Sequence, residues 1–127
     1  MSRILDHIDL RVPDRAAARA FYDRLLPAVG FTEWMDVPAG WISYNAPGGG
    51  PTEFFGFIES PGHVPNENRI AFWAESNATL DALVPLLREI GAQHIEGPGY
   101  DEGPGYYAVF FEDPFGNRLE ICHRERN

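Results

Sequence analysis

The first half of the chain carries a hydrophobic pattern that predicts one helix among several strands. Residues 4–12 alternate between apolar and polar side chains, which is the two-residue period of a half-buried strand. Asp14 can cap a helix over residues 15–26, whose apolar side chains recur every three or four positions until Pro27 ends it. Short strands separated by glycine and proline are predicted at residues 31–37, 41–45 and 52–58, which completes a βαβββ order.

The second half shows the same succession of patterns. Residues 69–74 predict a strand, and Ser76 or Asn77 can cap a helix that Gly91 closes. Pro85 lies inside the apolar stripe of this helix and is expected to kink or shorten it. Three strands are predicted at residues 93–96, 106–112 and 118–123, the last two joined by the turn sequence DPFG.

The two halves form an internal repeat. Placing His7 over Arg69 aligns the apolar positions of the two strand–helix pairs, and residues 60–68 form a connector without apolar periodicity. We therefore expect an α+β fold in which two βαβββ modules form an eight-strand cup with the helices outside. The expected organisation is a single domain over residues 1–127, with modules over about residues 3–60 and 67–124.

The composition excludes several classes of protein. The 127 residues are 44% hydrophobic and 23% charged, which is typical of a globular domain and not of a disordered or fibrous chain. Nineteen acidic against ten basic residues give a net charge of −9, so we expect neither nucleic acid nor a membrane as partner. All ten basic residues are arginine, so the chain has no lysine for a Schiff base or a phosphate-binding loop.

Cysteine usage and the absence of a leader favour the cytoplasm. Cys122 is the only cysteine, so no internal disulfide can form. The first residues lack a continuous apolar segment, and the chain has no apolar run of the roughly 18 residues that a membrane span needs.

The motifs that carry a family resemblance are LDHIDLRVPD at the start of the chain, FYDRLLPAVGF after it, RIAF in the second module and DPFGNRLEI in its last strands. Together they resemble the vicinal oxygen chelate superfamily, which includes glyoxalase I, extradiol dioxygenases, and fosfomycin- and bleomycin-resistance proteins. The resemblance covers nearly the whole chain. It marks the fold better than the reaction, because one fold serves many functions.

The resemblance implies a divalent metal in the cup. Carried over by motif, the ligand positions are His7 on the first strand, Glu120 on the last strand, Arg69 at the start of the second module and Glu53 near the fourth strand. Imidazole and carboxylate ligands would suit Zn, Fe, Mn or Ni.

Arg69 departs from the histidine that the resemblance implies at its position. A guanidinium has no lone pair to offer a metal, so metal binding is in question. Three interpretations stay open. Arg69 pairs with Glu120 or Glu53 in a metal-free salt bridge, it anchors an anionic group of a substrate, or a metal survives with water or a loop ligand such as His63.

Aromatic side chains are numerous for a chain of this length, and core packing is the ordinary role of each. Together they predict a cup walled by rings, which favours a planar or apolar small molecule. The residues expected to bind the ligand are Arg69, Trp73, Tyr106, Phe110 and Phe55.

Two functions follow from the resemblance. The first is a small-molecule enzyme, a glyoxalase-like lyase or an extradiol-type dioxygenase, with Glu120 as the catalytic residue. The alternative is a protein that binds and sequesters a small molecule without chemistry, as bleomycin-resistance proteins do. A homodimer is expected in both cases, because single-chain relatives with two modules commonly pair.

Overall fold

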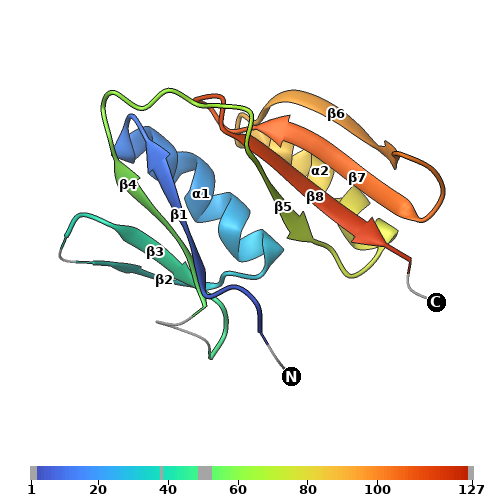
Figure 1. Cartoon of the computed structure of the whole chain (residues 1–127), viewed down its shortest axis with the longest axis horizontal. Helices are drawn as coiled ribbons and strands as arrows, with labels where there is room; N and C mark the ends of the chain where they lie inside the picture. The colour runs from blue at the N-terminus through green and yellow to red at the C-terminus, as the bar shows by residue number, and fades with distance from the viewer. Residues whose placement is uncertain (1–2, 38, 49–52, 126–127) are drawn as a thin grey trace. The chain divides into compact units, whose positions relative to one another are not determined.

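The computed structural model describes residues 3–37, 39–48 and 53–125. The elements, in chain order, are β1 (His7–Val12), α1 (Arg15–Val29), β2 (Glu33–Asp36), β3 (Ile42–Asn45), β4 (Phe54–Glu59), β5 (Arg69–Trp73), α2 (Asn77–Glu89), β6 (Gln93–Tyr100), β7 (Tyr106–Glu112) and β8 (Arg118–Arg124) (Figure 1).

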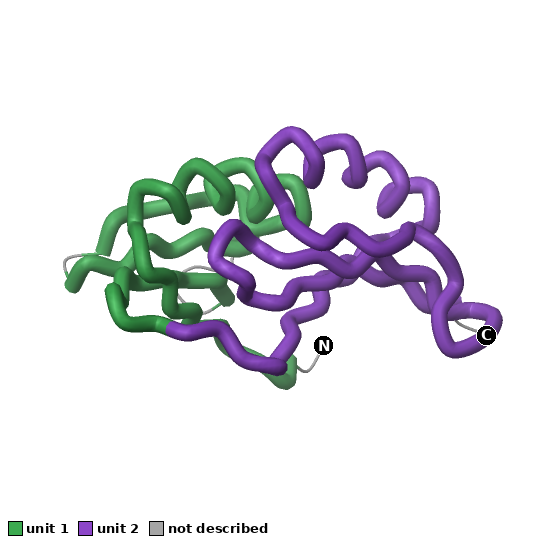
Figure 2. The backbone as a smooth tube through the Cα atoms, turned by 90° about the horizontal axis from the view of Figure 1, so that it is seen from above, with its two compact units in different colours: residues 1–63 green, residues 64–127 purple. Residues whose placement is uncertain are grey.

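The chain divides into two compact units, Met1–His63 and Val64–Asn127 (Figure 2). The first contains a four-stranded sheet in the order β1-β4-β3-β2, and the second a four-stranded sheet in the order β5-β8-β7-β6. In each sheet the first and last strands of the unit are parallel neighbours, and the remaining pairs are antiparallel. The α+β class and the two βαβββ modules are confirmed.

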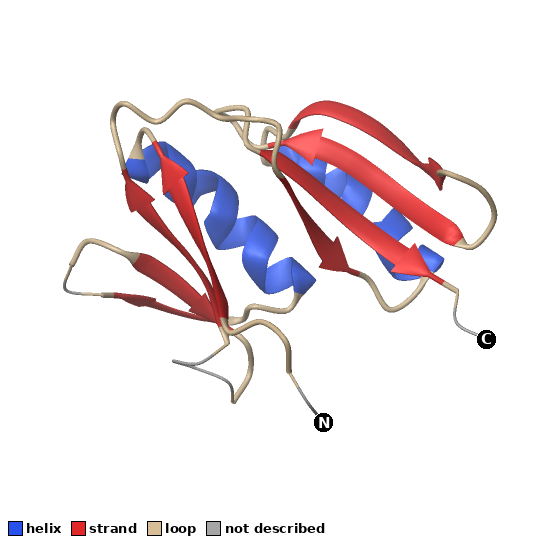
Figure 3. Ribbon diagram, viewed as in Figure 1, coloured by secondary structure: helices blue, strands red, loops and turns tan. Residues whose placement is uncertain are grey.

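Each unit packs its helix against one face of its own sheet (Figure 3). In the first unit the ring of Tyr22 on α1 contacts Phe55 and Phe57 on β4, with centroids 5.8 and 5.6 Å apart. In the second unit the buried residues of α2 pack with the buried positions of β7 and β8, such as Val109 and Ile121. We call the opposite face of each sheet its distal face.

Side-chain capping starts both helices where the sequence predicts. The Asp14 carboxylate accepts a hydrogen bond of 2.9 Å from the backbone N–H of Ala17, and the Ser76 hydroxyl accepts one of 3.0 Å from that of Thr79. Each bond satisfies an N–H that the first helical turn leaves without a partner. Ser76, and not Asn77, is therefore the cap of α2.

The two helical prolines do not end their helices. Pro27 lies inside α1, which continues to Val29, and Pro85 lies inside α2, which continues to Glu89. The prediction that Pro27 stops the first helix is wrong. A proline in the last turns removes only one backbone donor, and packing of the apolar stripe on the sheet outweighs that loss.

The strand bounds differ most at β6, which extends to Tyr100 and not to Glu96. Residues 97–100 lie beyond the predicted strand, but they continue it as an irregular strand whose register with β7 shifts twice. Glycine is common at such bulges because it adopts unusual backbone angles. The other strands lie within a few residues of the prediction. Thr52, the predicted start of β4, is outside the described residues.

Candidate functional site

The distal face of the first sheet holds a cavity of about 410 Å³. Most of its wall is apolar, because alternating strand positions direct aromatic and aliphatic side chains to this face. The lining residues are Asp9, Met35, Val37, Trp41, Ser43, Asn45, Phe54 and Gly56. A concave and mainly apolar site of this size suits a small organic molecule.

Few polar groups reach this cavity. Ser43 and Asn45 are buried on β3, and the Ser43 hydroxyl donates to the Asn45 amide oxygen at 3.0 Å. Asp9 on β1 supplies the one charged group among the lining residues. The cavity therefore offers a small number of polar contacts that could orient an apolar ligand.

His7 lies at the first position of β1 and stacks on the Phe54 ring, with centroids 4.5 Å apart. Its Nδ1 is 2.7 Å from an oxygen of Asp6, and its Nε2 is 3.6 Å from an oxygen of Asp9. Both ring nitrogens thus face carboxylates of neighbouring residues. The ring is fixed by local contacts beside the cavity.

Glu120 is buried on the distal face of the second sheet, at 5% exposure. Tyr106 on β7 is the register partner of Arg124 on β8, and its hydroxyl reaches diagonally to Glu120 and donates a hydrogen bond to Oε2. Burial and this carboxylate raise the pKa of Tyr106, while the Arg124 guanidinium stacks on the ring at 3.9 Å. Tyr106 therefore holds its proton toward Glu120 at neutral pH.

Cys122 lies one pleat from Glu120 on the same face. Burial and the neighbouring Glu120 carboxylate raise the pKa of its thiol. The thiol is therefore protonated at neutral pH, which does not suit a nucleophile.

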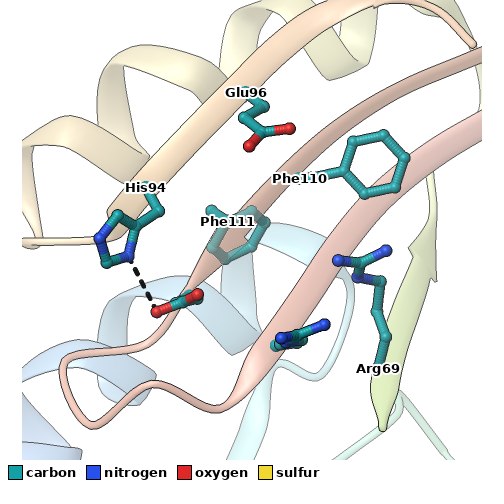
Figure 4. Close-up of a pocket in the computed structure, with 7 residues that line it drawn as sticks. Arg69, His94, Glu96, Phe110 and Phe111 are labelled. Carbon is teal, nitrogen blue, oxygen red and sulfur yellow. Dashed lines mark hydrogen bonds and ion pairs between the residues drawn. The ribbon is translucent and has the colours of Figure 1, made fainter. Parts of the chain in front are cut away.

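Arg69 lies on the distal face of the second sheet, where its guanidinium carbon stands 4.8 Å from the centre of the Phe110 ring (Figure 4). These two side chains line a second cavity of about 220 Å³, together with His94, Glu96, Phe111, Glu112 and Arg118. His94 Nδ1 lies 2.9 Å from Glu112 Oε1, the contact drawn as a dashed line. Among the described residues of its own unit Arg69 forms no ion pair, so the predicted salt bridge to Glu120 is not present.

The strand register identifies which residue of the first unit corresponds to Glu120. Glu120 is the partner of Ala71 on β5, and the equivalent pair in the first unit is Asp9 and Gly56. Gly56 has no side chain to offer a metal. Glu53 lies just before β4, with its carboxylate 4.0 Å from the Arg3 guanidinium and about half exposed.

The donor set does not fit a divalent metal. Of the four positions implied by the resemblance, Arg69 offers no lone pair, the strand register puts Gly56 and not Glu53 at the position equivalent to Glu120, and the Glu120 carboxylate accepts a hydrogen bond from Tyr106. Protein metal sites generally use three or four nitrogen, oxygen or sulfur ligands. Among the residues that the structure describes, no three His, Cys, Asp or Glu side chains are grouped to hold a metal ion.

The aromatic residues predicted to bind a ligand separate into two groups. Tyr106, Phe110 and Trp73 lie on strands of the second sheet, and Trp73 is 37% exposed beside the His123 ring. Phe55 is fully buried against Tyr22 on the helix side. The preceding residue on β4, Phe54, lies on the distal face and lines the cavity of the first sheet.

Sequence analysis missed several residues of the cavities. Ser43 and Asn45 alternate along a strand that was predicted, so their common face could be found from the sequence. The places of Met35, Gly56 and Arg118 depend on which strands pair and in what register.

No described helix is long and apolar enough to cross a membrane.

We expect the free energy of unfolding to fall as the pH rises above about 10, the ordinary pKa of tyrosine. The pKa values of Tyr106 and Tyr44 are raised in the folded chain, so the unfolded chain loses these protons first and alkali favours unfolding. Urea denaturation at about pH 9 and pH 11 should show a smaller loss of stability for Tyr106→Phe than for the natural chain. Lysine side chains ordinarily titrate in the same pH range as tyrosine, and this chain has none. An equal loss in Tyr106→Phe would contradict the assignment.

Comparison with known proteins gives one family description. Residues 4–121 match the model of the Glyoxalase/Bleomycin resistance protein/Dioxygenase superfamily. The uncharacterized protein YqjT of Bacillus subtilis is 29% identical, over 92% of this chain and 96% of its own length.

Solved structures show the same fold. A glyoxalase/bleomycin resistance protein from Albidiferax ferrireducens has a TM-score of 0.77 and 25% identity, over 95% of this chain and 98% of its own. A putative glyoxalase from Bacillus halodurans has a TM-score of 0.74 and 27% identity, over 94% of each chain.

Proposed function

Since this chain belongs to the Glyoxalase/Bleomycin resistance protein/Dioxygenase superfamily, we propose that it binds a small, largely apolar molecule on the distal faces of its sheets, without a resident metal ion. The observation that carries this proposal is the 410 Å³ cavity on the first sheet. Its walls include Trp41, Met35 and Phe54, and its floor has the few polar groups of β3. The superfamily commonly binds divalent metals, but the donor set of this chain does not support one.

Apolar burial would supply most of the binding energy. Each square ångström of apolar surface removed from water contributes roughly 25 cal/mol, and aromatic rings add contacts of defined geometry. Asp9 and the Ser43–Asn45 pair would determine the orientation of the bound ligand more than its affinity. A neutral or weakly polar ring system of modest size fits this distribution.

Catalysis on the bound molecule is the second candidate, and the Tyr106–Glu120 pair favours it. Glu120 is a buried carboxylate whose hydrogen-bond donor is a phenol, an arrangement that could take a proton from a substrate and stabilise the resulting charge. This would make the protein a lyase or isomerase of the glyoxalase-like kind. Turnover of hemithioacetals that is lost in Glu120→Gln would support it.

We expect Trp41→Ala to weaken binding of the neutral fluorescent probe N-phenyl-1-naphthylamine by about tenfold, because the variant removes an aromatic wall of the cavity. Trp34→Ala is the matched control, since Trp34 stacks against Arg19, 4.4 Å from its guanidinium carbon, and does not line the cavity. Probe titration before and after treatment with a chelator measures both effects.

Three results would contradict the proposed function. The natural chain could fail to bind the probe, Trp34→Ala could weaken binding as much as Trp41→Ala, or the chelator could abolish binding. Loss of probe binding after treatment with the chelator would indicate that a metal ion takes part in binding.

A homodimer is proposed with either function. Each sheet has two strands with only one neighbour in that sheet, namely β1 and β2 in the first unit and β5 and β6 in the second. Strands with unpaired edges can join a second copy of the chain. Light scattering at micromolar concentration should give the mass of two chains, and the mass of one chain would contradict the proposal.

A further inference from the structure

We propose that Arg69 and Arg118 together bind the carboxylate group of a small molecule in the 220 Å³ cavity of the second unit. This inference rests on the proposed function, and it adds a chemical class of ligand for the distal face of the second sheet. The site lies wholly within Val64–Asn127.

The strand register places the two arginines side by side. Their Cα atoms are partners in the parallel pair of β5 and β8, and neighbouring strands lie about 4.8 Å apart. Leu119, which follows Arg118, is fully buried on the helix side, so the alternation of the strand directs Arg118 to the distal face. Both arginines line the cavity.

The two positive charges have no partner in the described structure. Neither the Arg69 nor the Arg118 side chain makes a hydrogen bond or an ion pair to a described residue, and the Arg69 guanidinium lies over the face of Phe110. Like charges at paired strand positions destabilise a sheet. Glu112 is the register partner of Arg118 across β7 and β8, but its carboxylate lies 2.9 Å from His94 and forms no ion pair with either arginine. An anionic ligand would relieve the repulsion.

Two carboxylates also line this cavity and limit what can bind. The Oε1 atom of Glu112 lies 2.9 Å from Nδ1 of His94, within hydrogen-bond distance. Glu96 has no such partner and lies across Phe110 from Arg69 (Figure 4). A bound carboxylate must therefore approach the arginines and keep away from Glu96, which defines its orientation.

The ligand is identified by these contacts as a carboxylate attached to a flat or apolar body. Guanidinium groups bind carboxylates through paired, charge-assisted hydrogen bonds. The Phe110 ring beneath Arg69 offers an apolar surface for the remainder of the molecule. Benzoate has this chemistry and is small enough to serve as a probe, and benzamide is its uncharged isostere.

The test is a titration of the full chain with benzoate and with benzamide, followed by backbone amide NMR shifts. We expect benzoate to bind and to shift resonances of β5 and β8, and benzamide to bind at least about tenfold more weakly. Arg118→Gln and Arg69→Gln should each weaken benzoate binding by about tenfold. Glu96→Gln should strengthen it, because that variant removes a repelling charge and leaves both arginines in place.

Arg88→Gln is the matched control, since it removes the same charge from the exposed last turn of α2. Equal weakening in Arg88→Gln and Arg118→Gln, or equal binding of benzoate and benzamide, would overturn the proposal. So would weaker benzoate binding in Glu96→Gln. Trp41→Ala separates this site from the first cavity, because it should weaken the naphthylamine probe and leave benzoate binding unchanged.

Discussion

Gly97→Ala should lower the free energy of unfolding by about 3 kcal/mol, whereas Gly99→Ala should change it by less than about 1 kcal/mol. Gly97 has a φ of +96°, which only glycine adopts without strain. A Cβ at this position would lie 2.8 Å from the carbonyl oxygen of Ala108, a backbone atom of the neighbouring strand that cannot move alone. At Gly99 an added Cβ would meet no atom within 4 Å.

Urea denaturation of the two variants measures this difference. Because the glycines are two residues apart on β6, both substitutions add one methyl group to the same strand. A similar loss of stability in both would show that the close approach of β6 and β7 at Gly97 is not a constraint. A loss confined to Gly97→Ala would support the irregular strand that the sequence did not predict.

Phe57→Ala should lower the free energy of unfolding by about 4 kcal/mol, in the middle of the range for buried aromatic residues, and Phe54→Ala should lower it by less than half of that. Phe57 is fully buried and packs against the rings of Tyr22 and Tyr44, at 5.6 and 6.1 Å. Phe54 is half-buried on the other face of the same strand, where it lines the larger cavity.

The two phenylalanines should also separate in ligand binding. Phe54→Ala should weaken the naphthylamine probe, while Phe57→Leu, a milder variant that retains the fold, should leave probe affinity nearly unchanged. Chemical denaturation and probe titration on the same samples measure both. The assignment of faces on β4 would be wrong if Phe54→Ala were the more destabilising change.

The order of elements could be predicted because each element has its own periodic signal. Asp14 and Ser76 cap helices with apolar stripes, and the alternation in residues 4–12 marks the first strand. These signals are local, so they do not depend on which strands pair. The repeat was visible for the same reason.

The site could be predicted only in part, because it depends on register. The segment containing Phe54, Phe55 and Phe57 has aromatic residues on both faces, so its sequence does not say which face meets the helix. A shift of one residue moves every side chain of a strand to the other face. A shift of one residue separates the expected Phe55 from the observed Phe54, and one of three residues separates the expected Glu53 from Gly56.

The other contacts that sequence analysis missed join residues that lie on different strands, far apart in the sequence. Tyr106 and Glu120 share a turn-linked pair of strands, and their contact follows from a register that no single strand shows. Arg118 could not be identified as the neighbour of Arg69, because their strands are separated by α2, β6 and β7.

The parallel pairing within each sheet has a consequence for synthesis of the chain. In the second unit β8 lies between β5 and β7, so the strand that leaves the ribosome last in that unit is an interior strand. β5 has no neighbour in its sheet until β8 arrives, and the same holds for β1 and β4 in the first unit. Neither sheet can form progressively from its first strand during translation. Each unit must wait for its own last strand, and the apolar residues of β1 and β5 stay without their sheet partner until then.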